Sequence, residues 1–313
     1  MKTKMTALIF PGQGSQFSGM VKDFHDEFAI ARETFEIIEN SVKIKLRDII
    51  FNNESKLLNI TKYTQLAIFS SSMCIFNVLK NEINLDKLSI NYSLGHSLGE
   101  YSALTASKVI SIDDCSMLLK NRGELMQNAF KENMSGMCAI IGLDCSKVEN
   151  IIEDNELRVE VANDNSPLQV VISGTKEDLL NAEYVIMKNG AKKFIYLNVS
   201  SAFHSRLMKN AEKKMKIFLN KVNFQDSTYD IISNFSAKES KDSKIIFNNL
   251  AKQMSNKVRW VESIKCLENL NESNIIEIGP GNILSGLIKR ISNKFTLYSI
   301  NSIEDLYNFT NEI

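Results

Sequence analysis

The hydrophobic and polar positions of the chain follow two spacings, one typical of buried strands and one typical of helices. A continuous apolar run, Met5–Phe10, ends at a proline and predicts a buried parallel strand with a loop after it. Between residues 20 and 80, Phe24 and Phe28 begin a series of apolar residues at helical spacing. Thr61–Leu79 predicts one long, apolar-rich helix. We therefore expect a first strand followed by helices.

A second strand and two more helices are expected before residue 131. Ile90–Leu94 has the composition of a strand, and Ser97–Ser107 carries small and apolar residues at helical spacing. A further helix is predicted over Asp113–Phe130, with Ser111 or Asp113 as its N-cap. Only Gly95 and His96 separate the strand from the helix that follows it.

From about residue 136 the pattern changes to shorter elements in the order β-α-β-β-α-β. The expected elements are a strand at Met137–Leu143, a helix at Ser146–Asp154, strands at Val159–Ala162 and Gln169–Ser173, a helix at Lys176–Asn189 and a strand at Lys193–Val199. This order is typical of a ferredoxin-like arrangement. Because it interrupts the larger pattern, we interpret residues 132–198 as an inserted small subdomain.

The remaining chain alternates strands with helices. The expected elements are strands at Asp230–Ser233, Asn274–Ile278 and Phe295–Ile300 and helices at Met208–Leu219, Lys244–Gln253, Trp260–Leu270 and Ile283–Ile291. Residues 1–131 and 199–313 are therefore interpreted as one large α/β subdomain.

Composition narrows the function classes. Lys plus Arg and Asp plus Glu both total 37, so no basic face is implied and nucleic acid is not an expected partner. The five cysteines are scattered, odd in number and without a Cys-x-x-Cys pair, which indicates reduced thiols in a cytoplasm and no metal site. No apolar stretch approaches the length of a transmembrane helix, so no membrane association is expected.

The turn Gly95-His96-Ser97-Leu98-Gly99 is the strongest candidate for chemistry. A Gly-x-Ser-x-Gly run between a strand and a helix is typical of a nucleophile elbow, in which small neighbours allow a strained serine backbone. The helix N-terminus after Ser97 places positive partial charge where an oxyanion would form. The predicted fold class is accordingly α/β, with an α/β-hydrolase-like large subdomain, a parallel sheet and this elbow. A cleft between the elbow and the small subdomain is a natural ligand site.

A serine nucleophile needs a base, and the chain has three histidines. His25 lies among acidic residues and is interpreted as a solvated surface residue. His96 is adjacent to Ser97, where neighbouring side chains point in different directions. His204 is therefore the candidate base, and the alternative is a capping residue for the helix after it.

Two further residues have competing interpretations. The glycine-rich loop after the first strand lacks the third glycine of a dinucleotide fingerprint, because Phe17 stands there, so we expect Gln13 to face the site instead. Arg122 lies on a helix, and from helix spacing alone a surface salt bridge is favoured over an anion-binding role.

The assembled motifs resemble the malonyl-CoA:acyl carrier protein transacylases of fatty acid synthesis and the acyltransferases of polyketide synthases. The resemblance runs nearly end to end and rests on Pro11-Gly12-Gln13-Gly14-Ser15-Gln16, Gly95-His96-Ser97-Leu98-Gly99-Glu100-Tyr101, Arg122-Gly123, Ala162-Asn163, Ala202-Phe203-His204, Gln253 ahead of Val258-Arg259-Trp260, and Gly279-Pro280-Gly281. Lys257 departs from the proline often found there and affects only the local loop.

The resemblance implies the catalytic roles. Ser97 would form the acyl-enzyme and His204 would move the proton, with the backbone carbonyl of Gln253 orienting the imidazole in place of an acid. The backbone N–H groups of Gln13 and Leu98 would hold the oxyanion.

The same resemblance implies how the acyl group is chosen. Arg122 would form a bidentate pair with the malonyl carboxylate, which replaces the salt-bridge interpretation. Asn163 and His96 would lie near the acyl chain and the elbow. Phe203 would crowd a 2-methyl group, which favours malonyl over methylmalonyl by about 1–3 kcal/mol.

The implied activity is that of an S-malonyltransferase moving malonyl from malonyl-CoA, its substrate, to the phosphopantetheine thiol of an acyl carrier protein. No cofactor or metal is expected, and we expect a monomer. Whether the carrier serves fatty acid or polyketide synthesis stays open, because the segments around Arg122 and His204 also resemble acyltransferases that serve polyketide synthases in trans. The alternatives are an acyl hydrolase on the same scaffold and a non-catalytic carrier-docking module.

Overall fold

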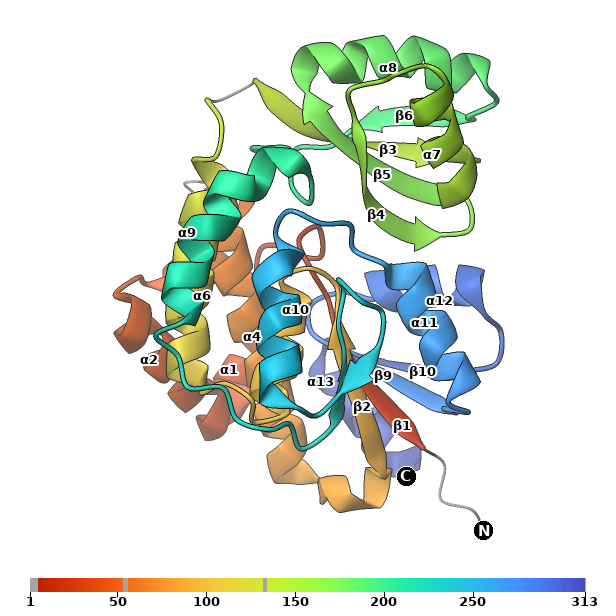
Figure 1. Ribbon diagram of the computed structural model, residues 1–313. Coiled ribbons are helices and arrows are strands. Elements are labelled where there is room, and N and C mark those ends of the chain that lie inside the picture. Colours follow the sequence, from red (N-terminus) through yellow and green to blue (C-terminus); the bar gives the residue numbers. More distant parts are fainter. Residues whose placement is uncertain (1–4, 53–55, 132–133, 313) are drawn as a thin grey trace.

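A computed structural model describes residues 5–52, 56–131 and 134–312 and contains two β-sheets (Figure 1). The strands of the larger sheet lie in the order β10-β9-β1-β2-β7-β8. Their bounds are β1 (Thr6–Phe10), β2 (Ile90–Gly95), β7 (Asp230–Ile232), β8 (Glu239–Ser240), β9 (Asn274–Ile278) and β10 (Thr296–Ile300). All pairings in this sheet are parallel except that of β8 with β7. The parallel sheet expected from the sequence is confirmed.

Strand β1 lies at the centre of this sheet because both of its faces are apolar. Leu8 and Phe10 belong to one hydrophobic core, and Ala7 and Ile9 belong to the core on the opposite face. All four side chains are fully buried, as expected for a continuous apolar run in a parallel sheet.

Helices cover both faces of the larger sheet, with α2, α4 and α6 on one side and α11 and α12 on the other (Figure 1). The helices around this sheet are α1 (Lys22–Glu27), α2 (Ala29–Val42), α3 (Leu46–Phe51), α4 (Thr61–Glu82), α5 (Gly99–Ala106), α6 (Ile112–Gln127), α9 (Lys209–Leu219), α10 (Ser243–Gln253), α11 (Trp260–Asn269), α12 (Ile283–Ile291) and α13 (Ile303–Glu312), with 3-10 turns η1 (Leu57–Asn59), η2 (Leu85–Leu88) and η3 (Arg206–Met208). Helix α4 is buried on nearly all sides, which explains its apolar composition.

The smaller sheet is antiparallel, with strand order β4-β5-β3-β6. Its elements are β3 (Ser135–Ile141), α7 (Cys145–Asp154), β4 (Glu160–Ser166), β5 (Gln169–Thr175), α8 (Lys176–Lys188) and β6 (Lys193–Tyr196). This order is consistent with a ferredoxin-like arrangement, and the sheet has a hydrophobic core separate from that of the larger sheet. The expected boundary at residue 132 lies outside the described residues, so the division into 1–131 plus 199–313 and 132–198 stays a prediction.

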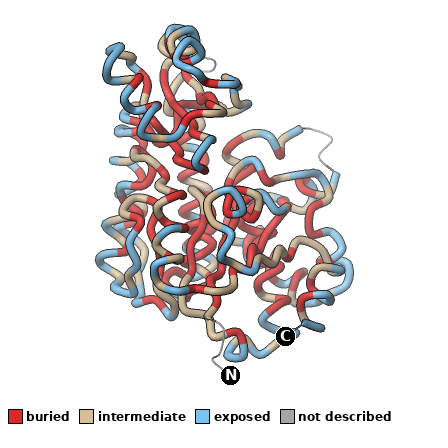
Figure 2. Tube along the Cα trace, turned by 90° about the vertical axis from the view of Figure 1, so that its right-hand side faces the viewer, coloured by how far each residue is buried: buried red, intermediate tan, exposed pale blue. Residues whose placement is uncertain are grey.

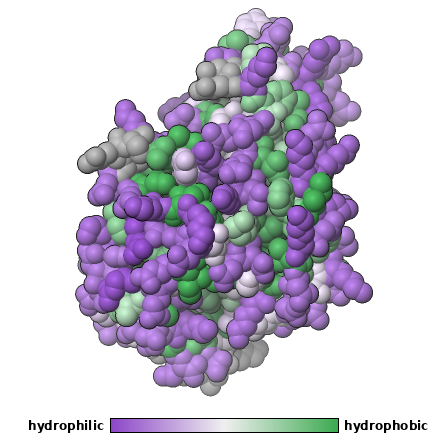
Figure 3. Space-filling view, turned by 90° about the vertical axis from the view of Figure 1, so that its left-hand side faces the viewer, coloured by the Kyte–Doolittle hydropathy of each residue, from purple (hydrophilic) through white to green (hydrophobic). Residues whose placement is uncertain are grey.

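Several elements differ from the sequence expectations. Strand β4 continues to Ser166, four residues beyond its predicted end, and β6 ends at Tyr196 rather than Val199. Helix α13 and the two-residue strand β8 were not expected. Buried positions fill the interior of both sheet regions, whereas exposed positions follow the outer turns (Figure 2). The face nearest α2 and α9 is mainly hydrophilic, with apolar groups visible between polar ones (Figure 3).

Candidate active site

The turn between β2 and α5 has the geometry of a nucleophile elbow. Ser97 has a φ of 53°, in the left-handed region that a serine seldom adopts. A Cβ on Gly95 would lie 2.1 Å from the backbone carbon of Gly99, and a Cβ on Gly99 would lie 2.1 Å from the backbone oxygen of Phe10. Both glycines are therefore required for the turn to close, as the sequence predicted.

The loop after β1 lies directly against this elbow. A Cβ on Gly12 would come within 2.4 Å of the His96 backbone oxygen, so only glycine permits the approach. The contact places Gln13 and Leu98 on the wall of the cavity that contains Ser97. Among the described residues, neither the Gln13 N–H nor the Leu98 N–H has a hydrogen-bond partner. Two free amides beside a serine hydroxyl are the arrangement that an oxyanion requires.

His204 contacts the nucleophile with one ring nitrogen and the backbone with the other. Its Nε2 lies 2.8 Å from Ser97 Oγ, and its Nδ1 lies 3.0 Å from the backbone oxygen of Gln253. Because that carbonyl can only accept, Nδ1 carries the proton and Nε2 is free to accept the proton of Ser97. Burial, together with the charge of Arg122, lowers the pKa of His204 to about 3, so the imidazole is neutral at neutral pH.

Arg122 is buried beside the same hydroxyl, with 1 % of its surface exposed. Its Nη1 donates to Gln65 Oε1 at 2.7 Å, and its Nη2 donates to Gln253 Oε1 at 2.8 Å and to Ser97 Oγ at 3.1 Å. No carboxylate of the described residues forms an ion pair with this guanidinium. The surface salt bridge favoured by helix spacing alone is therefore wrong. A buried cation without a carboxylate partner provides a place for an anionic ligand.

One small cavity, of about 130 Å³, joins these groups. It is lined by residues of the larger sheet region and by residues of β3, β4 and β5: Gln13, Gln65, His96, Ser97, Leu98, Arg122, Met126, Met137, Asn163, Asn165, Val171, Leu197, Val199, Phe203 and His204. The structure thus brings together every site residue predicted from the sequence. Gln253 is the one predicted residue outside the lining, and it contacts Ser97, His204 and Arg122 from behind.

His96 and Asn163 both line this cavity and lie next to each other. His96 Nε2 lies 2.8 Å from Asn165 Oδ1 and 3.4 Å from Asn163 Nδ2, and its ring meets Trp260 edge to face. Burial lowers the pKa of His96, which favours the neutral ring. The Oδ1 atom of Asn163 is buried without a hydrogen-bond partner among the described residues, so it is available to a ligand.

Sequence reasoning missed several amides around the elbow, and Asn234 is the most important of them. Asn234 Oδ1 accepts from the Ser97 N–H at 2.7 Å, while its Nδ2 donates to the Gly95 oxygen at 2.7 Å. It follows β7, so its place at the carboxyl end of a parallel strand was the one available signal. Gln65 and Asn165 were missed as well, because they lie on elements that meet the elbow only in the folded chain.

The interpretation of His25 as a solvated surface residue is wrong. Only 19 % of its side chain is exposed, because its ring packs edge to face on Phe35 and Phe51 at centroid distances of 6.0 and 5.1 Å. The sequence showed the acidic neighbours of His25 but not the aromatic rings that cover it. His25 does not line the Ser97 cavity, so His204 is still the histidine that meets the nucleophile.

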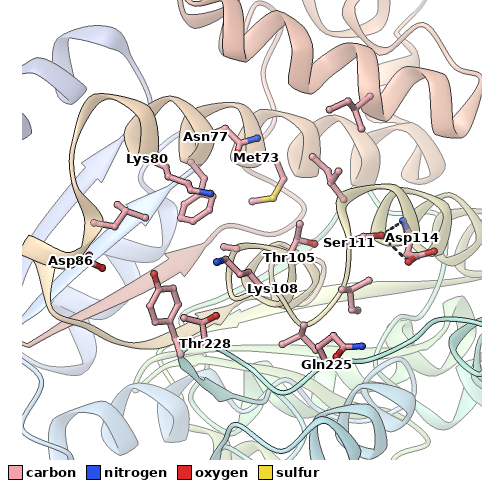
Figure 4. Close-up of a pocket in the computed structure, with 18 of the residues that line it drawn as sticks. Met73, Asn77, Lys80, Asp86, Thr105, Lys108, Ser111, Asp114, Gln225 and Thr228 are labelled. Atoms are coloured by element: carbon pink, nitrogen blue, oxygen red, sulfur yellow. Dashed lines mark hydrogen bonds between the residues drawn. The ribbon is translucent and has the colours of Figure 1, made fainter.

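A larger cavity, of about 820 Å³, is lined by a different set of residues (Figure 4). Met73 and Asn77 of α4, Thr105 at the end of α5 and the segment around Gln225 line it, with Lys80 and Lys108 reaching into the opening. None of the predicted site residues lines this cavity. The chemistry is therefore assigned to the smaller cavity, where the reactive groups meet.

Within the described residues, no three His, Cys, Asp or Glu side chains are placed to hold a metal ion. The five cysteines form no disulfide. Across the same part of the chain, no helix combines the length and the apolar character needed to span a bilayer.

Comparisons with known proteins show what the chain is similar to. Residues 7–295 match the acyl transferase domain family. The malonyl CoA-acyl carrier protein transacylase of Staphylococcus aureus (strain MRSA252) is 35% identical over 304 residues, covering 96% of this chain and 97% of the relative. The transacylase of the same name from Bacillus subtilis (strain 168) is also 35% identical, covering 96% of this chain and 94% of the relative.

Solved structures are similar along the whole chain. The acyl-carrier-protein-S-malonyltransferase of Bartonella henselae is 36% identical with a TM-score of 0.93, and 98% of each chain is covered. A malonyl-transacylase solved in complex with its type II PKS acyl-carrier protein is 32% identical with a TM-score of 0.94, covering 99% of this chain and all of the other. These likenesses include both the larger and the smaller sheet.

Proposed function

Because this chain belongs to the acyl transferase family of malonyl-CoA:acyl carrier protein transacylases, we propose that it transfers a malonyl group from coenzyme A to an acyl carrier protein. One observation supports malonyl as the acyl group. Arg122 is a buried cation 3.1 Å from the nucleophile, and its hydrogen-bond acceptors are neutral oxygens. An acyl chain that ends in a carboxylate would supply the missing charge.

In the first half-reaction, Ser97 Oγ attacks the thioester carbonyl while His204 Nε2 accepts the hydroxyl proton. The tetrahedral oxyanion is held by the N–H groups of Gln13 and Leu98. When the carbon–sulfur bond breaks, the protonated His204 returns the proton to the departing coenzyme A thiolate. Ser97 is then left as the malonyl ester.

The second half-reaction repeats these steps with the thiol of the carrier's phosphopantetheine arm. His204 removes the thiol proton, the thiolate attacks the Ser97 ester, and the collapse of the intermediate returns the proton to Ser97 Oγ. Arg122 holds the malonyl carboxylate in both halves through a two-pronged contact that a guanidinium fork allows. Phe203, Asn163 and His96 shape the space around the acyl chain.

The backbone carbonyl of Gln253 replaces the acid of a triad. It accepts from His204 Nδ1 and fixes the tautomer, but it adds no negative charge next to the imidazole. This arrangement suits a base that is already neutral because of burial.

Intact-mass spectrometry after mixing the protein with malonyl-CoA tests the proposal. We expect a malonyl adduct that is absent in Ser97→Ala and retained in Ser102→Ala. Ser102 is a matched control, because its buried hydroxyl has no hydrogen-bond partner among the described residues. An adduct that persists without Ser97 would place the nucleophile elsewhere.

Fatty-acid-type and polyketide-type carriers are then offered to the acylated protein. Malonyl on the carrier thiol supports the transferase, whereas free malonate in the presence of carrier would indicate an acyl hydrolase. The carrier that accepts malonyl faster identifies the partner.

We further infer a cytoplasmic monomer that needs no cofactor and does not bind nucleic acid. The equal totals of 37 basic and 37 acidic residues support the last inference, and the five unpaired cysteines support a reducing compartment. Light scattering after size exclusion should give the mass of one 35.4 kDa chain, and a dimer mass would contradict the monomer.

A further inference from the structure

Glu100 carries a buried carboxylate beside the elbow that the proposed reaction does not use. It lies in the first turn of α5, directly after Gly99, and only 1 % of its surface is exposed. No lysine or arginine of the described residues forms an ion pair with it. Burial raises its pKa to about 7. A carboxylate kept in such a place needs specific hydrogen-bond partners.

Two partners of Glu100 are also the residues that hold the backbone of Ser97. Glu100 Oε2 accepts from Gln253 Nε2 at 2.8 Å and from the Asn234 N–H at 3.3 Å. Gln253 Nε2 also donates to the Ser97 oxygen at 2.7 Å, and Asn234 Oδ1 accepts from the Ser97 N–H. Glu100 therefore lies behind the elbow and joins the groups on both sides of the nucleophile.

The contact with Glu100 also sets which way the Gln253 amide faces. Its Nε2 end meets two acceptors, the Ser97 oxygen and Glu100 Oε2, while its Oε1 end accepts from Arg122 Nη2. A reversed amide would place donor against donor at Arg122 and acceptor against acceptor at Glu100. Glu100 thus helps to keep an oxygen of Gln253 aimed at Arg122.

Charge supports the same connection. Arg122 is fully buried, and the negative charge of Glu100 attracts it across the Gln253 amide. Low dielectric strengthens such an interaction, and a chain of hydrogen bonds between the two charges reinforces it. The guanidinium is therefore held from behind while its position next to Ser97 stays open to a ligand.

We propose that Glu100 is a positioning residue for acyl selection, which fixes Gln253 and through it the guanidinium of Arg122 where a dicarboxylic acyl group is recognised. The inference rests on the proposed function, because it assigns Glu100 a part in the preference for malonyl. Under this proposal, Glu100 affects which acyl group is accepted more than it affects the rate of the acylation step.

Initial rates of Ser97 acylation by malonyl-CoA and acetyl-CoA test the inference. Glu100→Gln keeps the shape of the side chain and removes its charge. We expect the ratio of malonyl to acetyl kcat/KM to fall about tenfold, because a hydrogen bond to a charged group is lost from the support of Arg122. The loss should appear mainly in KM for malonyl-CoA. Glu100→Asp keeps the charge at shorter reach and should retain more of the ratio than Glu100→Gln.

Glu277→Gln is the matched control. Glu277 is also fully buried, and its carboxylate accepts from the N–H groups of Leu284 and Ser285 at 3.0 and 2.8 Å, with no bond to the groups around Ser97. It should change thermal stability and leave the malonyl-to-acetyl ratio unaltered.

Three outcomes overturn the inference. The ratio could stay unchanged in Glu100→Gln, both substrates could slow equally, or Glu100→Asp could lose more preference than Glu100→Gln. If the wild-type protein prefers malonyl-CoA, any of these outcomes refutes the role of Glu100 and leaves the proposed function standing. A wild-type protein that takes up no malonyl refutes the proposed function and this inference together.

Discussion

Arg122→Ala is the most direct test of how the acyl group is chosen. The substitution removes a guanidinium that is buried, lies 3.1 Å from Ser97 Oγ and has no carboxylate partner among the described residues. In the proposed complex its fork holds the malonyl carboxylate. Acetyl-CoA lacks that carboxylate and should not depend on the fork.

The magnitude follows from the contacts that would be lost. Two hydrogen bonds between a guanidinium and a carboxylate contribute about 1.5–3 kcal/mol each, or about 3–6 kcal/mol together. Part of this free energy is offset, because Arg122 already donates to Gln65 and Gln253 in the free protein. Binding therefore gains only the difference between the hydrogen bonds to the carboxylate and those to the two amides. The lower half of the range corresponds to about a 10²–10³-fold loss in kcat/KM for malonyl-CoA.

The assay measures acylation of Ser97 with malonyl-CoA and acetyl-CoA under single-turnover conditions. We expect the malonyl rate to fall by the stated factor and the acetyl rate to stay level or rise. Arg122→Lys keeps the charge but lacks the planar fork, so its malonyl rate should lie between those of Arg122→Ala and wild type. An unchanged malonyl-to-acetyl ratio in a folded Arg122→Ala protein would refute the reasoning.

Three further predictions concern the base and the elbow. His204→Ala should slow acylation by malonyl-CoA about 10²–10⁴-fold in stopped-flow measurements, and a near-normal rate would discard His204 as the base. Because the pKa of His204 is lowered to about 3, the imidazole stays unprotonated as pH falls through 6.5. The kcat/KM for acetyl-CoA, which should not depend on the charge of Glu100, should therefore show no acid limb near pH 6.5, and such a limb would contradict the buried neutral imidazole. Gly99→Ala should lower the free energy of unfolding by about 1–3 kcal/mol or more and abolish the adduct, since its Cβ would lie 2.1 Å from the Phe10 oxygen. Gly286→Ala, where a Cβ meets nothing within 4 Å, should be tolerated, and equal urea midpoints for the two variants would contradict the argument from close packing.

The sequence predicted the elbow well because most of its determinants are local. Gly95 is needed by its contact with Gly99, and the flanking strand and helix were predicted from adjacent residues. Gly99 was recognised from the motif, although the contact that requires it is with the distant Phe10. The order of strands and helices in the smaller subdomain was also predicted, because each element has its own local pattern. By contrast, α13 was missed although Leu306 and Phe309 form a short buried face there.

The burial of Arg122 could not be predicted from the residues of its own helix, α6. Its neighbours Asn121 and Glu124 are polar, and the burial of Arg122 depends on how closely α6 approaches α4. Gly123 permits that approach, because a Cβ there would lie 2.7 Å from Lys62 Cα. Asn234 was missed for a related reason, since its partner Ser97 is 137 positions away. Contacts between residues so far apart in the sequence depend on how the elements pack. The hydrophobic periodicity of the sequence does not predict that packing.

One part of the wall of the small cavity comes from a different stretch of the chain than the reactive groups. Ser97, Arg122 and His204 lie outside β3–β6, whereas Met137 and Val171 belong to that sheet. Exchanging the stretch between relatives would therefore alter the shape offered to the acyl chain without disturbing the groups that make and break the ester. New acyl preferences could arise in such a protein by recombination of segments, with the catalytic apparatus inherited intact.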